Sequence, residues 1–123
     1  KMINYTLAQL AEAAVNALED KKGKDIKLLR TGELTVIADY FVLCTANSTT
    51  HIKTLSDEVD SVLSKMGEPP LRREGYRAGG WVLLDFGCIV VHIFLQETRA
   101  FYNLERLWSD AEVILPSSLP GPC

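Results

Sequence analysis

Alternating apolar and polar positions from Trp81 to Leu95, interrupted at Gly87-Cys88, predict a β-hairpin with a two-residue turn. Glycine at the first turn position accepts the positive φ that such a turn requires, and this register pairs Leu84 with Val91. Side chains alternate along a strand, so one face is apolar throughout: Val82, Leu84, Phe86, Ile89, Val91, Ile93 and Leu95. The other face is mixed: Trp81, Leu83, Asp85, Val90, His92 and Phe94. We expect helices to cover the apolar face and water or a partner to meet the mixed one.

Apolar positions at helical spacing predict two amphipathic helices earlier in the chain. Thr6 and Gln9 form a capping box at the start of the first helix. Its apolar stripe is Leu7, Leu10, Ala11, Ala14 and Leu18. Ser48 is placed to cap the second helix, and Gly67 ends it. The stripe of the second helix steps by three and four residues: Ile52, Leu55, Val59, Val62 and Met66.

The remaining segments complete the order α-β-β-α-β-β-α. Strands are predicted over 25–31 and 38–45, with a short edge strand within 71–76. Thr98 is expected to cap a last helix whose inward positions are Phe101, Leu104, Leu107, Trp108 and Ala111. Residues 1–112 are therefore predicted to form a single α/β domain, with one mixed sheet and helices mainly on one face. Residues 113–123 are rich in proline and are predicted to be a flexible tail.

Composition narrows the class of partner. The 123 residues carry a net charge of −3, which disfavours direct recognition of nucleic acid or of an anionic membrane. A basic protein partner remains compatible with this charge. The sequence shows no apolar run long enough to span a membrane and no signal peptide, so we expect a cytoplasmic protein.

The candidate catalytic groups do not form a recognisable site. Cys88 and His92 are available as nucleophile and base, but their spacing does not guarantee contact. The three cysteines are scattered without a Cys-x-x-Cys motif, which favours reduced cysteines over disulfides or a zinc site. Asp39 and Asp85 lie in predicted strands and suggest a two-carboxylate metal site, but no Gly-rich phosphate loop accompanies them. A hydrogen-bonding role is favoured for Asp39. We predict no catalytic residue, no metal and no cofactor.

Two charged clusters are interpreted as ordinary surface. Asp57, Glu58 and Asp60 flank Val59 and are expected to form the solvated face of the second helix. A cluster of arginines around Tyr76 is expected to serve solubility: Arg72, Arg73 and Arg77. For Trp81 the alternatives are a corner of the core and a binding face shared with Asp85, His92 and Phe94. Because Trp, Tyr and Arg dominate the energetics of protein interfaces, the mixed face is interpreted as a binding face and not as a catalytic pocket.

Several segments, in this order and spacing, resemble the Iojap family over residues 5–111. They are 38–45 (ADYFVLCT), Ser48 with His51, Glu74-Gly75, 81–87 (WVLLDFG), 91–94 (VHIF) and 99–108 (RAFYNLERLW). The bacterial members of this family are the ribosomal silencing factors. The resemblance implies a fold similar to nucleotidyltransferases without their catalytic residues. It also implies homodimers when the protein is free of the ribosome.

The resemblance further implies a mechanism. The factor would dock on the large ribosomal subunit, on the ribosomal protein numbered fourteen, and sterically block joining of the small subunit. Translation would be repressed when nutrients are limiting. Trp81 matches the family's tryptophan and is the expected anchor. Weaker candidates for the same surface are Glu74, Asp85, His92, Arg99 and Tyr102. The alternatives are a small metal-dependent nucleotidyl- or phosphoryl-transfer enzyme, using Asp39 and Asp85, and a dimeric scaffold with no ribosomal role.

Overall fold

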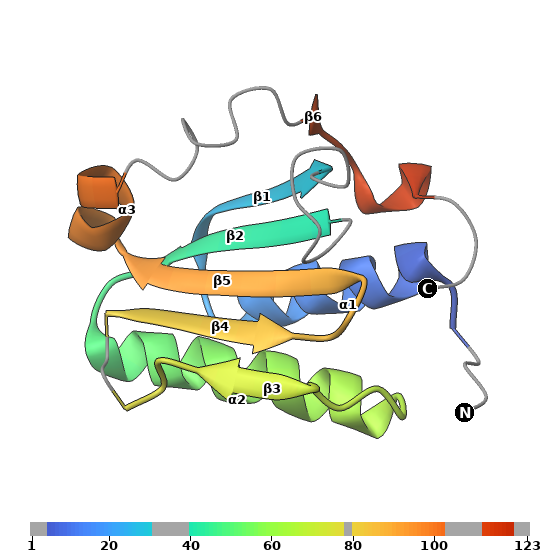
Figure 1. Cartoon of the computed structure of the whole chain (residues 1–123), viewed down its shortest axis with the longest axis horizontal. Coiled ribbons are helices and arrows are strands. Elements are labelled where there is room, and N and C mark those ends of the chain that lie inside the picture. The colour runs from blue at the N-terminus through green and yellow to red at the C-terminus, as the bar shows by residue number, and fades with distance from the viewer. Residues whose placement is uncertain (1–4, 31–39, 78–79, 103–111, 120–123) are drawn as a thin grey trace.

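A six-stranded mixed sheet, in the order β3-β4-β5-β2-β1-β6, forms the centre of the molecule (Figure 1). The computed structural model describes residues 5–30, 40–77, 80–102 and 112–119. The strands are β1 (Lys24–Arg30), β2 (Tyr40–Ala46), β3 (Arg72–Glu74), β4 (Trp81–Asp85), β5 (Ile89–Leu95) and β6 (Glu112–Val113). The helices are α1 (Leu7–Asp20), α2 (Thr49–Lys65), α3 (Gln96–Tyr102) and the 3₁₀ turn η1 (Pro116–Ser118). The prediction of a single α/β domain with a mixed sheet is confirmed.

The parallel pair β2 and β5 occupies the middle of the sheet, and every other neighbouring pair is antiparallel. The predicted hairpin register is confirmed, with Leu84 opposite Val91. Its turn is also confirmed: Gly87 has φ of 95°, and the Phe86 amide donates to the Ile89 carbonyl over 2.9 Å. Local turn chemistry therefore places β4 beside β5 in the expected register.

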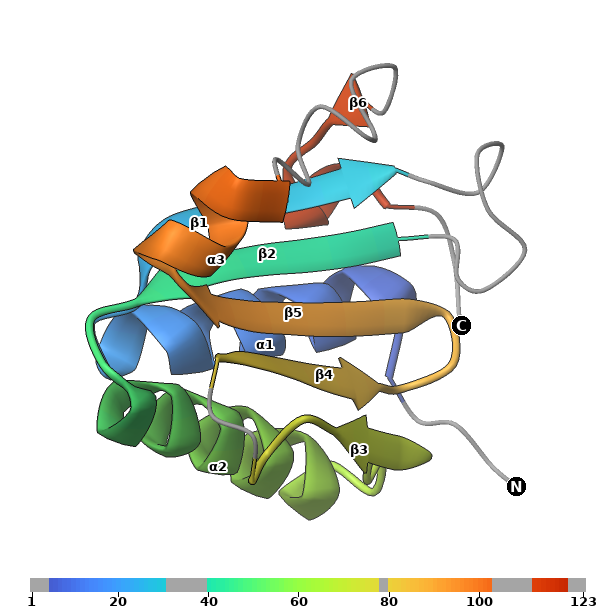
Figure 2. The same ribbon diagram turned by 60° about the vertical axis from the view of Figure 1, so that its left-hand side comes forward.

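Helices α1 and α2 lie side by side against one face of the sheet (Figures 1 and 2). Both predicted caps are present: Thr6 and Gln9 form the capping box of α1, and Ser48 accepts from the His51 amide at the start of α2. The stripes of the two helices meet the apolar face of the hairpin in one core. From the sheet, that core includes Val42, Cys44, Val82, Leu84, Ile89, Val91 and Ile93.

The opposite face of the sheet becomes less buried from its middle towards the β3 edge. Leu43, Val90 and Phe94 are buried, whereas Trp81 and Leu83 on β4 are half-buried. Helix α3 lies on this side, near the end of β5 (Figure 2). The expectation that this whole face stays partly free is therefore wrong for its middle. The opening lies at β4 and the edge strand β3.

The last helix and the tail differ from their predictions. Helix α3 begins at Gln96, directly after β5, so Thr98 lies within the helix and does not cap it. The predicted inward positions after Tyr102 lie outside the described residues, as does Asp39. In the tail, β6 pairs with β1, and Leu119 is buried in the core beside α1. The described part of the tail is thus packed on the domain, because Leu119 is buried in the core and Ile114 packs against it.

Candidate functional site

Trp81 and His92 form a hydrogen-bonded pair on the open side of the sheet. Trp81 donates its indole Nε1–H to Nδ1 of His92 over 3.1 Å. His92 is only 4% exposed, and desolvation lowers the pKa of its ring from 6.5 to about 4. The ring is therefore neutral at pH 7, and its Nδ1 lone pair is available to accept. The expectation that His92 lies on a wetted face is wrong, because His92 is buried and β5 lies in the interior of the sheet, between β4 and β2.

A hollow of about 310 Å³ opens beside this pair, lined by Glu74, Gly75, Trp81 and Leu83. We call these four residues the Trp81 surface. Glu74 lies directly opposite Leu83 across the β3–β4 ladder, so the two side chains share one face. Gly75 has φ of +80°, and a Cβ at this position would collide with the carbonyl oxygen of Trp81. Glycine is therefore required for the chain after β3 to approach the start of β4.

Acidic groups border the Trp81 surface. Arg72 binds Glu74 over 2.7 Å and Asp85 over 3.0 Å. The second carboxylate oxygen of Asp85 accepts from the Gly87 amide over 2.8 Å. Both oxygens of Asp85 are thus engaged, one with a cation and one with the hairpin turn. This arrangement fits a structural carboxylate at the rim of a binding surface better than a metal ligand.

The acidic residues of α2 bind β3 and are not simply a solvated helix face. Arg73 projects to the opposite side of β3 from Arg72 and binds Asp60 over 2.8 Å and Asp57 over 3.3 Å. Tyr76 donates to Asp57 over 3.0 Å, and this hydrogen bond is the main cause of the raised pKa of the tyrosine. The Arg73 guanidinium lies 4.4 Å from the centre of the Tyr76 ring. These contacts hold the edge strand onto α2.

Arg99 is a buried anchor of α3. It is 5% exposed, donates to the Thr45 hydroxyl and the Asp25 carbonyl, and lies over the Phe94 ring. The buried Arg99 side chain therefore stabilises the domain and is not exposed to a partner. Tyr102, the other candidate on this helix, is its last residue, and the placement of its side chain lies outside the described structure.

The carboxyl ends of β2 and β5 border a second hollow, of about 230 Å³. Its lining is Lys24, Thr45, Ala46, Asn47, Leu95, Gln96 and Glu97. Mixed α/β sheets commonly bind ligands in such a crevice, where the connections of adjacent parallel strands diverge. Here the hydroxyl of Thr45, one of the lining residues, already accepts a hydrogen bond from Arg99.

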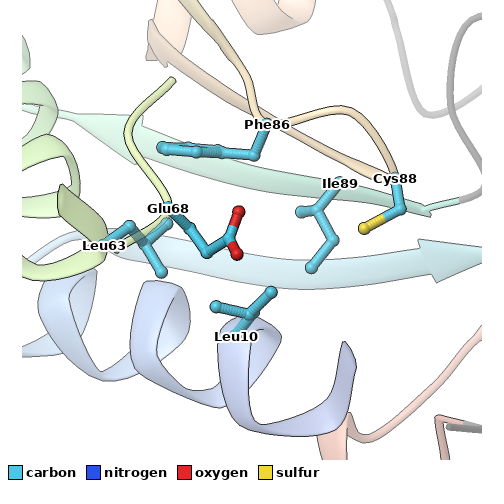
Figure 3. A pocket seen from close by; sticks show the side chains of 6 residues that line it. All are labelled: Leu10, Leu63, Glu68, Phe86, Cys88 and Ile89. Atoms are coloured by element: carbon cyan, nitrogen blue, oxygen red, sulfur yellow. The ribbon is translucent and has the colours of Figure 1, made fainter. Parts of the chain in front are cut away.

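A third pocket lies between α1, α2 and the hairpin turn (Figure 3). Its lining is Leu10, Leu63, Glu68, Phe86, Cys88 and Ile89, and its volume of about 10 Å³ is close to that of one water molecule. Cys88 is disulfide-bonded, so the expectation of reduced cysteines is wrong for this residue, which lies half-buried in a turn. Cys44 is a free thiol in the core, and burial raises its pKa to about 12, which makes it unreactive.

Within the described residues, no group of three or more His, Cys, Asp or Glu side chains is arranged to hold a metal ion. No helix of this part of the chain is long and apolar enough to cross a membrane. The sequence indicated Trp81, Glu74 and Asp85, and the structure places these three on β3 and β4, the two strands at one edge of the sheet. The sequence placed Leu83 on the mixed face of the hairpin but did not single it out as an interface candidate, because that residue is one of many aliphatics in the hairpin.

Bacterial proteins of similar length match this chain over most of its residues. Residues 4–121 match the family model described as ribosomal silencing factor during starvation. A ribosomal silencing factor of Halalkalibacterium halodurans is 41% identical over 113 residues, covering 92% of this chain and 94% of the relative. Its counterpart in Bacillus subtilis is 35% identical over 102 residues, covering 83% of this chain and 86% of the relative.

Solved structures agree with the sequence relatives. The crystal structure of a Chromobacterium violaceum protein superposes with a TM-score of 0.82 at 36% identity, covering 85% of this chain and 88% of that one.

The chloroplastic Iojap protein of Zea mays is 35% identical over 107 residues, covering 85% of this chain and 45% of the relative. Since the matches in sequence and in fold extend over most of the domain, the chain belongs to the Iojap family of ribosomal silencing factors.

Proposed function

We propose that this protein binds the large ribosomal subunit at the face that meets the small subunit and sterically blocks subunit joining. The observation that carries the proposal is the Trp81 surface, where a half-buried tryptophan and leucine border an open hollow. A partly exposed aromatic beside a concave surface is the kind of residue that dominates binding energy at protein interfaces. Occupation of a subunit interface needs no chemical step, so the proposed action is not enzymatic.

The charge around the Trp81 surface favours a basic partner. Glu74 lies on it and Asp85 beside it, and Arg72 pairs with both, so these two carboxylates and one guanidinium leave one net negative charge. The whole chain carries a net charge of −3. Ribosomal proteins are commonly basic, and complementary charge accelerates encounter with the correct partner. We infer that the partner is the large-subunit ribosomal protein numbered fourteen, as the family resemblance implies. The name of a mouse relative, mitochondrial assembly of ribosomal large subunit protein 1, supports the choice of subunit.

The family resemblance also supports three further parts of the proposal. The protein would repress translation when nutrients are limiting, would act in the cytoplasm, and would form a homodimer when free of the ribosome. The oligomeric state is open to direct measurement by light scattering. A dimer that dissociates on addition of large subunits is the expected result, whereas a monomer at all concentrations would contradict it.

Sedimentation with isolated subunits tests the proposal. Purified protein is expected to co-sediment with large subunits and not with small ones, and to lower the yield of joined ribosomes when both are mixed. Trp81→Ala should weaken co-sedimentation at least tenfold, since the anchor is removed. Leu115→Ala is the matched control, because Leu115 is 72% exposed and follows β6, at the opposite edge of the sheet from β3. Unchanged affinity of the Trp81→Ala variant would remove the assignment of this surface.

The alternative of metal-dependent nucleotidyl or phosphoryl transfer receives no support from Asp85. Its two oxygens are engaged by Arg72 and by the Gly87 amide. Calorimetry with ATP and Mg²⁺ provides the corresponding test. Tight binding that Asp85→Asn abolishes would favour the enzyme over the binding protein.

A further inference from the structure

The indole of Trp81 is held in one orientation by the residues beside it. Its Nε1–H points to Nδ1 of His92 over 3.1 Å. The ring centroid lies 5.9 Å from that of His92 and 5.9 Å from that of Phe94, with both ring pairs tilted. Trp81 is directly opposite Phe94 across the β4–β5 ladder, and this pairing fixes the position of the Trp81 backbone as well. Within the described residues, a hydrogen bond to His92 and the aromatic contacts with His92 and Phe94 thus confine the Trp81 ring.

His92 is itself held in place from the opposite side. Its ring packs on Phe41 with centroids 4.7 Å apart, and the residue is buried in the central strand β5. The described neighbours on this face of β2 and β5 are mainly apolar: Phe41, Leu43, Val90 and Phe94. An imidazole in such surroundings loses hydration, which is costly unless its nitrogens are used. The acceptor nitrogen is used by a residue on the rim of the open surface, which connects the buried strand with the candidate interface.

The hydrogen bond also decides which part of the indole is available to a partner. The N–H is the only polar group of a tryptophan side chain, and here it is directed inwards to His92. The outward part of the ring that borders the hollow is therefore hydrocarbon. A side chain that is already ordered loses less conformational entropy on binding than one that must be immobilised.

We propose that His92 is a positioning residue for partner binding: by accepting the indole N–H, it presents the apolar edge of Trp81 to the ribosomal protein in a preformed orientation. This inference rests on the proposed function, in which Trp81 is the anchor. It assigns His92 a role beneath the interface and not in contact with the partner. It also assigns the recognition by Trp81 to apolar contact and not to a hydrogen bond from the indole.

Two variants of His92 separate positioning from packing. An asparagine side chain keeps an oxygen near the position of the imidazole Nδ1, so His92→Asn is expected to retain large-subunit affinity within about twofold. His92→Leu removes the acceptor at similar volume and is expected to weaken binding about tenfold, because the N–H is left without its partner and the indole reorients. In both variants, urea denaturation establishes that the domain is folded under the binding conditions.

A double-mutant cycle with Trp81→Ala provides the decisive comparison. When Trp81 is absent, His92→Leu should cause no further loss of binding, since there is no indole to position. An equal loss in both backgrounds would show a general structural effect and overturn the inference. Unchanged binding of His92→Leu would also overturn it, while the tenfold loss from Trp81→Ala still upheld the proposed function. An unchanged Trp81→Ala variant would instead remove the proposed function itself.

A measurement on the wild-type protein does not depend on the folding of any variant. NMR of uniformly ¹⁵N-labelled protein is expected to show a scalar coupling between Trp81 Nε1 and His92 Nδ1 across the N–H···N hydrogen bond. The Nε1–H resonance should also lie downfield of that of a solvated indole. Absence of the coupling, with a solvent-like indole resonance, would overturn the inference.

Discussion

The guanidinium of Arg99, in α3, donates to the hydroxyl of Thr45 at the end of β2 over 2.6 Å, and both residues are buried. The same nitrogen donates to the carbonyl oxygen of Asp25, in β1, over 2.9 Å. One cation thus joins three elements that are far apart in the sequence. Because hydrogen bonds to a charged donor are stronger than neutral ones, this contact fixes α3 to the sheet.

Arg99→Ala is expected to lower the free energy of unfolding by about 3 kcal/mol, since two charge-assisted hydrogen bonds are lost and Thr45 and Asp25 lose a buried donor. Chemical denaturation at pH 7 measures the change. Arg72→Ala is the control, because the ion pairs of this arginine are half-exposed and are worth about 1 kcal/mol or less. Equal effects of the two substitutions would contradict an anchoring role for Arg99.

The buried imidazole of His92 predicts a loss of stability in mild acid. Its pKa is about 4 in the folded protein, against 6.5 for the ordinary side chain, so the unfolded chain binds the proton more tightly. The contribution of His92 is complete above pH 6.5 and is lost as the pH falls towards 4. The free energy of unfolding should fall by about 2 kcal/mol at pH 5 and about 3 kcal/mol at pH 4 from this group alone.

Comparison with His92→Leu isolates this contribution from the carboxylates that titrate in the same range. The difference in unfolding free energy between wild type and variant should shrink as the pH falls from 7 to 4, because only the wild type has the imidazole. Urea denaturation at each pH gives both values. A difference that stays constant over this interval would show that His92 is not the group responsible.

The hairpin, the helix caps and the helical stripes were predictable because each depends on residues that are close in sequence. Gly87 sets its own turn, and Thr6 and Ser48 cap helices that begin at the next residue. Alternation along β4 and β5 was enough to separate the core face from the other face. These local patterns identified the α/β class and the strand on which Trp81 lies.

The burial of residues on the mixed face of the hairpin was not predictable, because it depends on how the strands pair across the sheet. His92 has the same alternation as Trp81, and only the pairing of β5 with β2 places it in the middle of the sheet. Arg99 likewise looked like a surface residue until α3 brought it to Asp25, 74 residues earlier in the chain. Trp81, Glu74 and Asp85 lie on β3 and β4, at the less buried edge of the sheet.

Tyr76 reports on the contact between β3 and α2. Its pKa is raised mainly because the phenol donates to the Asp57 carboxylate, which favours the protonated ring. Asp57→Asn is expected to lower the pKa of Tyr76 towards its ordinary value of 10. NMR titration of the Tyr76 ring resonances measures it. Glu58→Gln is a neighbouring control with the same change of charge, and an equal shift in both variants would point to general electrostatics instead of the hydrogen bond.

Gly75 and Gly67 form a matched pair for testing how β3 positions the interface. Both have left-handed backbones, with φ of +80° and +85°, so alanine costs about 1–2 kcal/mol at either site. Only at Gly75 would the added Cβ also collide with the Trp81 carbonyl, whereas nothing lies within 4 Å at Gly67. Gly75→Ala should therefore destabilise the domain by at least about 1 kcal/mol more, as denaturation would show. It should also weaken co-sedimentation with large subunits several-fold, while Gly67→Ala leaves it unchanged. Equal binding by the two variants would mean that the approach of Gly75 to Trp81 does not shape the interface.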